Sequence, residues 1–178
     1  LSVYNSVETD SHAISALASF YSDLGDNASA IKAIESSEMK FRPDLLAQLA
    51  VYYWFDKQTQ KAVDLLESVP KDTFSVTDWS NLGVGRAEIG RFGLAIEALN
   101  EAMAMNRNYQ FAYYALAQIY ALMGEAEPAI NHLRELLVVK SIHLRRLTTE
   151  RTFEAIRNTS LYTEFLGELK GTVGDAFL

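Results

Sequence analysis

WSNLGVGRAEIGRFGLAIEAL, at residues 79–99, contains two apolar helical segments separated by a glycine. In the first segment, Trp79, Leu82 and Gly83 have the i, i+3, i+4 spacing that places side chains on one face of a helix. Gly90 is suited to end that helix, because glycine readily adopts the left-handed conformation that caps helices. This stretch therefore predicts a helix, a tight turn and a second helix.

The same pattern recurs along the chain at intervals of 32, 33 and 34 residues. The second helix of each copy begins with an alanine: Ala30, Ala62, Ala95 and Ala129. A large aliphatic residue follows four positions later: Ile34, Leu66, Leu99 and Leu133. A leucine with a small neighbour precedes the alanine: Leu17-Ala18, Leu49-Ala50, Leu82-Gly83 and Leu116-Ala117. We expect the small alanine to allow close contact between the paired helices, because a longer side chain would clash there.

Glycines, tyrosines and prolines agree with these boundaries. A glycine lies five residues before the alanine in every copy except the second, which has Lys57: Gly25, Gly90 and Gly124. A tyrosine lies nine residues before it in every copy except the third, which has Arg86: Tyr21, Tyr53 and Tyr120. The prolines are expected at helix starts or after a helix end, where a missing amide hydrogen costs little: Pro43, Pro70 and Pro128.

Trp79-x2-Leu82-Gly83 followed by Ala95-x3-Leu99 resembles the tetratricopeptide repeat, a helix–turn–helix unit of 34 residues. The resemblance implies an all-α fold, a right-handed superhelix (α-solenoid) of about four helix pairs with a C-terminal capping helix. We place four repeats within residues 11–143, at about 11–42, 43–75, 76–109 and 110–143, and a capping segment at 144–170. Residues 1–10 and 171–178 are expected to be frayed. The apolar side chains expected to cover the end of the last repeat are Phe153, Ile156, Leu161, Phe165 and Leu166.

The resemblance also implies a concave face, lined by the first helix of each repeat, that binds a peptide or helix of another protein. Its lining positions are His12, Ser15, Ser19, Ser22, Asp23, Asp44, Ala47, Val51, Trp54, Phe55, Thr77, Ser80, Val84, Ala87, Glu88, Phe111, Tyr114, Gln118, Ala121 and Leu122. We expect the large aromatic side chains to contact the partner, namely Trp54, Phe55, Phe111 and Tyr114. Asn81 and Gln118 could hydrogen-bond a peptide backbone. Alternatively, the aromatic residues pack against neighbouring helices and the two amides are solvated.

Composition excludes several other classes of function. The 178 residues have a net charge of −7 and contain no cysteine, which argues against nucleic acid and anionic membranes as partners and excludes thiolate metal sites. The thirteen-residue apolar tract at 111–123 is too short to span a bilayer. No metal-binding spacing involves His12, His132 or His143. We expect no cofactor and no catalysis. The compartment stays open: we favour the cytoplasm, and the periplasm also suits a cysteine-free domain.

Two functional hypotheses follow. In the first, the protein is a scaffold or adaptor that binds a partner protein in the concave groove. In the second, it is a regulatory or targeting module of a larger enzyme whose catalytic domain lies outside this chain. Self-association into a homo-oligomer is a third, weaker possibility.

Overall fold

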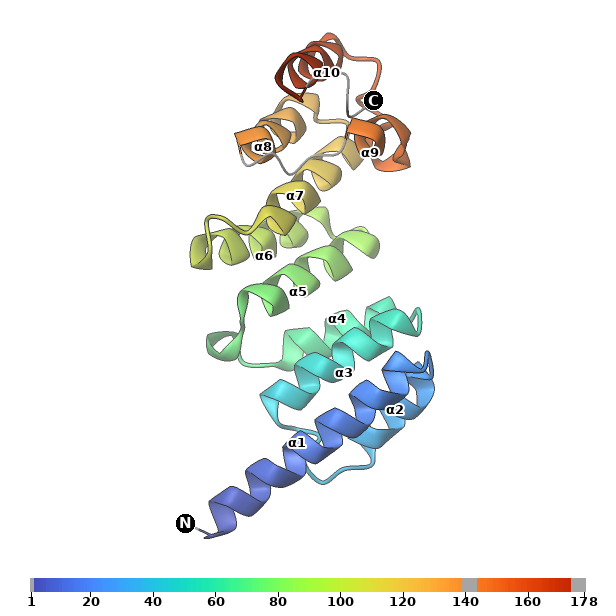
Figure 1. The fold of residues 1–178 in the computed structure, drawn as a ribbon, viewed down its shortest axis with the longest axis vertical. Helices are drawn as coiled ribbons and strands as arrows, with labels where there is room; N and C mark the ends of the chain where they lie inside the picture. The colour runs from blue at the N-terminus through green and yellow to red at the C-terminus, as the bar shows by residue number, and fades with distance from the viewer. Residues whose placement is uncertain (1, 139–143, 174–178) are drawn as a thin grey trace. The chain divides into compact units, whose positions relative to one another are not determined.

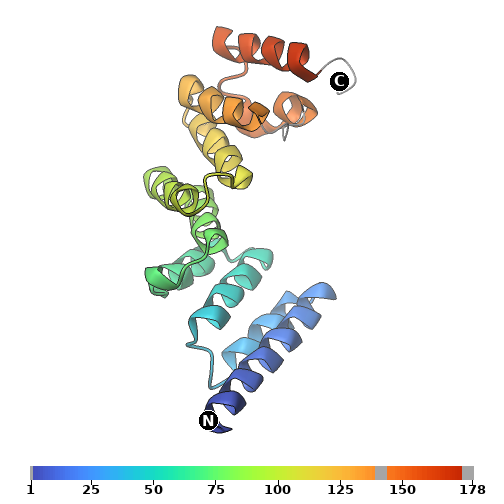
Figure 2. The same ribbon diagram turned by 60° about the vertical axis from the view of Figure 1, so that its left-hand side comes forward.

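The computed structural model describes residues 2–138 and 144–173, with side chains described over 10–136 and 147–171. Every regular element within these ranges is helical, so the all-α prediction is confirmed. The α-helices are α1 (Ser2–Asp23), α2 (Asn27–Glu35), α3 (Pro43–Phe55), α4 (Thr59–Ser68), α5 (Val76–Glu88), α6 (Phe92–Met105), α7 (Gln110–Leu122), α8 (Ala126–Val138), α9 (Leu144–Thr149) and α10 (Ser160–Val173), shown in Figures 1 and 2. Two short 3-10 helices are η1 (Lys71–Thr73) and η2 (Arg151–Phe153).

The chain divides into two compact units, Leu1–Arg91 and Phe92–Leu178. In unit 1, α1 packs on α2 and α3 on α4, and the pairs are joined by contacts of α2 with α3 and of α4 with α5. In unit 2, α7 packs on α6 and α8, α10 packs on α8, and η2 packs on α7. The boundary between the units lies inside the third predicted repeat.

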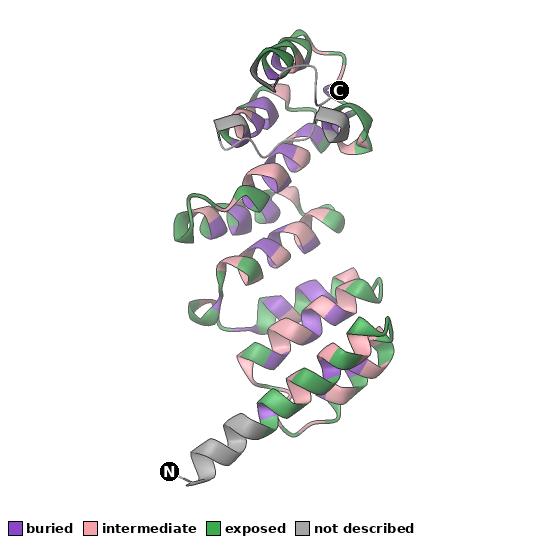
Figure 3. Cartoon of the chain, viewed as in Figure 1, coloured by how far each residue is buried: buried purple, intermediate pink, exposed green. Residues whose placement is uncertain are grey.

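The recurring alanines are buried, as their spacing predicts: Ala30, Ala95 and Ala129 are 0% exposed and Ala62 is 5% exposed. The aliphatic residues four positions later are buried too, in the helices coloured by burial in Figure 3. Ala30, Ala62 and Ala129 lie on the second helix of the pairs α1–α2, α3–α4 and α7–α8, so their small side chains allow the close helix contact that the sequence predicts.

The predicted glycine turns are confirmed, and the exception follows the same geometry. Gly25, Gly90 and Gly124 have φ near +78° and Lys57 has φ +63°. In every copy the residue after this position donates its backbone N–H five residues back, as Gln58 does to the Tyr53 carbonyl at 2.8 Å. The turn therefore requires the left-handed backbone conformation. Lys57 adopts it although its Cβ atom comes close to the following carbonyl oxygen there, a strain that glycine avoids.

The second helix of the second repeat is short, as Pro70 predicts. After α4, the Lys71 ammonium donates to the carbonyl oxygens of Leu66 and Val69 at 2.7 and 2.9 Å. It therefore satisfies acceptors that the missing next turn leaves free. Pro43 is the first residue of α3 and Pro128 lies in the first turn of α8, so neither interrupts a helix interior.

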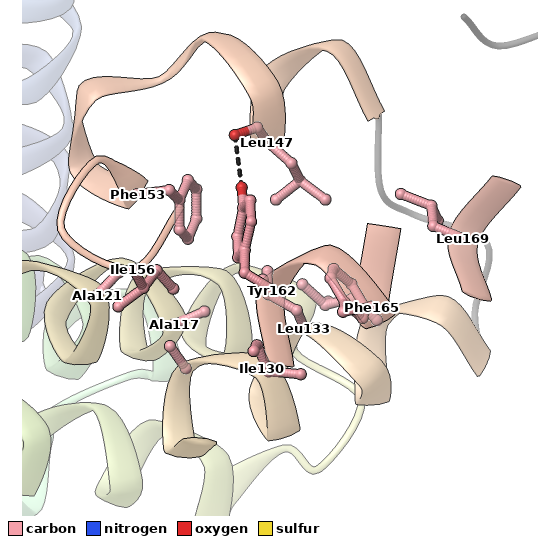
Figure 4. Close-up of a cluster of buried hydrophobic side chains, with 12 residues drawn as sticks. Ala117, Ala121, Ile130, Leu133, Leu147, Phe153, Ile156, Tyr162, Phe165 and Leu169 are labelled. Carbon is pink, nitrogen blue, oxygen red and sulfur yellow. Dashed lines mark hydrogen bonds between the residues drawn. The ribbon is translucent and has the colours of Figure 1, made fainter. Parts of the chain in front are cut away.

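The predicted C-terminal cap is correct in kind and wrong at one residue. Phe153, Ile156 and Phe165 are fully buried against α7 and α8 (Figure 4). Leu161 is 37% exposed instead, and Tyr162 occupies the buried position, where its hydroxyl donates to the Leu147 carbonyl at 2.6 Å. The physical reason is the register of α10, whose buried positions 162, 165 and 169 recur at helical spacing and leave 161 on the solvent side.

The ends of the described chain differ from the expected frayed termini. Residues 2–10 continue α1 upstream of the first repeat, since they contain neither glycine nor proline to end a helix. At the other end α10 extends to Val173, and residues 174–178 lie outside the described residues.

Candidate functional site

An open hollow in unit 1 lies between α1, the start of α3 and the segment that leads into α5. It has a volume of about 490 Å³. Groove positions predicted from the resemblance border it, namely His12, Asp44 and Ala47. The other lining residues are Arg42, Pro43, Val69, Thr73, Phe74 and Asp78. Apolar side chains and charged side chains thus meet in one open site.

The charges around this hollow are held by local bonds. Arg42, the residue before α3, places its Nε 3.0 Å from the Asp44 carboxylate. The Asp78 carboxylate accepts from the Ser75 backbone N–H at 2.9 Å, while the Ser75 hydroxyl oxygen accepts from the Asp78 N–H. This capping box starts α5 and fixes Asp78 at the hollow. A ligand would meet preorganised polar groups here.

A second, much smaller cavity of about 10 Å³ lies among α3, α4 and α5, beside Trp54 and Asn81. A Cβ atom at Gly85 would come within 2.8 Å of the Val63 side chain, so the helices meet closely at this point. The Trp54 indole N–H donates to the Glu88 carboxylate at 3.0 Å. Asn81, on α5, lines the same cavity.

The three predicted contact residues of unit 1 do not all lie at one site. Trp54 and Asn81 border the small cavity, whereas Phe55 is the last residue of α3 and is 56% exposed. None of these three lines the large hollow. The structure brings Trp54 and Asn81 together and leaves Phe55 apart from the cavity.

The predicted contact residues of unit 2 lie on α7. Phe111 is 48% exposed. The Tyr114 hydroxyl and the Gln118 amide both donate to Glu150 Oε2, at 2.7 and 2.9 Å. The Tyr114 ring also packs edge-on against Phe153, with centroids 6.1 Å apart. Tyr114 and Gln118 therefore meet at one carboxylate that the chain itself supplies.

The sequence did not predict several of the residues that lie at these sites. Arg42 and Phe74 lie between helices and have no place in the helical periodicity. Asp78 had a local signal, because Ser75-x2-Asp78 has the spacing of a helix-capping box. Glu150 had none, since its bonds reach residues more than thirty positions upstream.

His12 and His132 have different surroundings. His12 is exposed and borders the hollow. His132 is half-buried and stacks on Tyr120 with ring centroids 5.6 Å apart, and its burial lowers its pKa. His143 lies outside the described residues. Over residues 10–136 and 147–171 no group of three or more acidic or histidine side chains could hold a metal ion. The described helices include none with the length and hydropathy of a membrane span.

Comparisons with known proteins agree with the repeat pattern. A tetratricopeptide repeat model matches residues 112–139. Superkiller protein 3 of Schizosaccharomyces pombe is 37% identical over 75 residues, which make up 42% of this chain and only 5% of that protein. A crystal structure of MamA protein shares 25% identity over 90% of this chain and 88% of its own, with a TM-score of 0.74. A kinesin light chain from Podosopora anserina with nearly identical TPR-like repeats shares 20% identity over 90% of this chain and 93% of its own, with a TM-score of 0.68.

The family model and the solved structures rest on different observations. The model matches sequence within α7 and α8, whereas the solved structures match the arrangement of most of the described helices. Together with the alanine, glycine and leucine positions, they show that this chain has the all-α solenoid fold of tetratricopeptide repeat proteins and that residues 112–139 match the model of that repeat.

Proposed function

We propose that this protein is an interaction scaffold or adaptor that binds a peptide or helix of a partner protein along the groove positions of its first helices, without catalysing a reaction. The hollow of unit 1 carries the proposal, because groove positions from α1 and α3 border it together. Proteins with this fold commonly serve as protein-interaction scaffolds. The partner is expected to be a protein rather than nucleic acid, since the chain has a net charge of −7.

The hollow has the chemistry of a peptide site. Ala47 is half-buried and offers apolar surface to a side chain of the partner, while Val69 and Phe74, which are 3% and 5% exposed, form the apolar floor beside it. Arg42 and Asp78 offer charged groups at the same opening. Its volume of about 490 Å³ lies within the range of ligand sites, roughly 300–1,000 Å³. One apolar side chain with its flanking peptide groups would fit these features.

The test is substitution at Ala47, which is half-buried beside the hollow. Partners are first captured with the full chain and identified by cross-linking and mass spectrometry. Dissociation constants are then measured for a purified partner. Ala47→Trp is expected to weaken binding by about tenfold or more, because the indole fills the space that the partner needs. Ala28→Trp, on the exposed side of α2, is the matched control and should bind like the wild type.

Equal affinity of Ala47→Trp and wild type, with unchanged helical circular dichroism, would contradict the groove assignment in unit 1. Trp54→Ala and Tyr114→Ala then test the aromatic contacts. Both residues already bond internal glutamates, so their unfolding curves must be recorded beside the affinities. Lost binding at unchanged stability would assign them to the partner site.

The alternative is a regulatory or targeting module within a larger enzyme. The likeness to Superkiller protein 3 supports considering it, because the matched 75 residues are a small part of that long protein. The sequence of the full-length gene separates the two hypotheses. A catalytic signature in the same polypeptide favours the regulatory module, and its absence favours the scaffold.

A further inference from the structure

Exposed apolar residues lie near the C-terminal end of α1, beside the side chains that pack on α2. Leu17 is 47% exposed, Phe20 is 57% exposed and Leu24 is 67% exposed. Leu17 and Phe20 lie three residues apart on one side of α1, Leu24 follows directly after the last residue of the helix, and we call the three residues the α1 stripe. Contiguous apolar residues on a helix surface commonly mark a contact site.

The chain itself shows what covers this side of a first helix. Thirty-two residues after Leu17 and Phe20, α3 has Leu49 and Tyr52, which are 4% and 5% exposed. They belong to one buried cluster with residues of α2, including Ile31 and Ile34. The same side of α5 faces α4, because a Cβ atom at Gly85 would meet the Val63 side chain. The equivalent side of α1 has no covering helix among the described residues.

A hydrogen bond to a glutamate accompanies the contact of α3 with α2 and the contact of α5 with α4. The Tyr53 hydroxyl donates to the Glu35 carboxylate, which comes from the covering helix α2. In the next repeat the Arg86 guanidinium donates to Glu67 of α4 at 3.1 Å. The equivalent donor in the first repeat is the Tyr21 hydroxyl. No partner for it lies within the described part of the chain, so an acidic acceptor is the missing complement.

The covering helices share a sequence pattern. In α2, Ala30 is followed by Ile34 and Glu35, and in α4, Ala62 is followed by Leu66 and Glu67. A helix with a small residue, then an aliphatic residue four positions later and an acid next to it, is therefore complementary to the side of α1 that carries the stripe and Tyr21.

The segment before α1 differs from the segments before α3 and α5. Loops of seven residues, 36–42 and 69–75, bring the chain from α2 to α3 and from α4 to α5. The equivalent residues, 4–10, belong to α1 itself. The seven-residue connection that leads from a covering helix to the next first helix in the later repeats is thus helical here, so within the described residues no covering helix reaches α1 by that route.

We propose that the α1 stripe and Tyr21 form a docking surface for an amphipathic helix of another protein, whose docked face has the small-x3-aliphatic-acidic pattern of α2 and α4. This surface differs from the groove positions of α1, which include His12, Ser15 and Ser19. It would allow the protein to hold two partners, one on each side of its first helix.

The probe is a synthetic peptide with the sequence of residues 26–37, which contains α2. A peptide this short forms little helix by itself, so a lactam bridge between a glutamate placed at residue 28 and Lys32 holds it helical. Both bridged positions are exposed in α2, so the bridge leaves the docked face free. Fluorescence anisotropy with the labelled peptide and the full chain is expected to show saturable binding. Leu17→Asp and Phe20→Asp should each weaken it by about tenfold or more, since a charge would be buried.

Matched controls separate this surface from general stickiness and from unfolding. Phe41→Asp removes another aromatic side chain, 77% exposed and outside the stripe, and should bind the peptide like the wild type. All three replaced residues are exposed, so the circular dichroism should not change. A peptide with Glu35→Lys should bind several-fold more weakly to the wild type, and Tyr21→Phe should reduce that difference.

Three results would overturn the proposal. The first is no binding of the peptide to the wild type. The second is equal binding by Leu17→Asp, Phe20→Asp and wild type, which would place the peptide elsewhere. The third is a wild-type dimer in light scattering that Leu17→Asp converts to monomer, which would make a second copy the occupant of the stripe.

Discussion

Two helices, α1 in unit 1 and α8 in unit 2, carry apolar residues beyond the contact with their paired helix. These residues are buried on α8 and exposed on α1. On α8, Ile130 and Leu133 are covered by α10 through Tyr162 and Phe165, and all are within 1% of complete burial. On α1, the residues of the stripe are 47–67% exposed. The repeat pattern thus specifies how one helix pair meets the next, while residues outside the pattern decide whether the last exposed side is covered.

The largest expected effect is in the covered region. Phe165→Ala removes a fully buried ring from the cluster of Figure 4 and should destabilise the chain by about 3–5 kcal/mol. Chemical denaturation followed by circular dichroism measures it. Leu161→Ala, one helical position outside the buried side, is the control and should change stability little. Similar losses for both variants would show that α10 does not cover α8 in the observed register.

The next prediction compares equivalent positions directly. Leu49→Ala should cost about 2–5 kcal/mol, because Leu49 is buried between α2 and α3. Leu17→Ala occupies the same repeat position and should cost less than about 1 kcal/mol, because Leu17 is already half exposed. Unfolding free energies from denaturant titration test the pair. Equal costs would mean that a covering contact on α1 exists in solution.

High pH should weaken the covered region. Burial raises the pKa of Tyr162 to about 12, from the ordinary value of 10.0. Between those values the unfolded chain loses this proton while the folded chain keeps it, so the stability that Tyr162 contributes is lost as the pH rises toward 12. The loss is about 2 kcal/mol by linkage. Denaturation midpoints across this range measure it, and Tyr162→Phe should flatten the slope. An equally steep slope in that variant would assign the effect to other groups.

The smallest effects concern the turn between paired helices. Lys57 has a left-handed backbone without being glycine, so Lys57→Gly should stabilise unit 1 by up to about 1 kcal/mol. Gly124→Ala at the equivalent turn of unit 2 should destabilise by about 1 kcal/mol. Thermal unfolding of both variants measures the pair. A destabilised Lys57→Gly would mean that the Lys57 side chain contributes more than its strained backbone costs.

The sequence alone predicted the helix pairs, because the features that form them are local. It did not predict features that depend on contacts between distant residues. The buried alanines and the turn glycines are local requirements, so their spacing predicts them wherever the pair is formed. The turn at Lys57 shows that the required backbone geometry persists without its preferred residue. The choice of Tyr162 over Leu161 depends on the register of α10, which a single copy of a helix does not reveal.

The candidate site was less predictable than the fold. Trp54 and Tyr114 donate to Glu88 and Glu150, which lie 34 and 36 residues downstream. These bonds connect residues of separate helices and have no signature in either helix alone. Periodicity therefore placed the side chains on first helices, and only the structure showed their hydrogen-bond partners.

Native-state hydrogen exchange of the full chain tests most directly whether α1 is open on one side while α8 is covered. We predict that the amides of α8 and α10 exchange with the highest opening free energies, because both contribute to the buried cluster of unit 2. The amides of α1 should exchange at distinctly lower free energy, and adding the helical peptide of residues 26–37 should raise their protection. Amides of α1 as protected as those of α10, with no response to the peptide, would contradict this account.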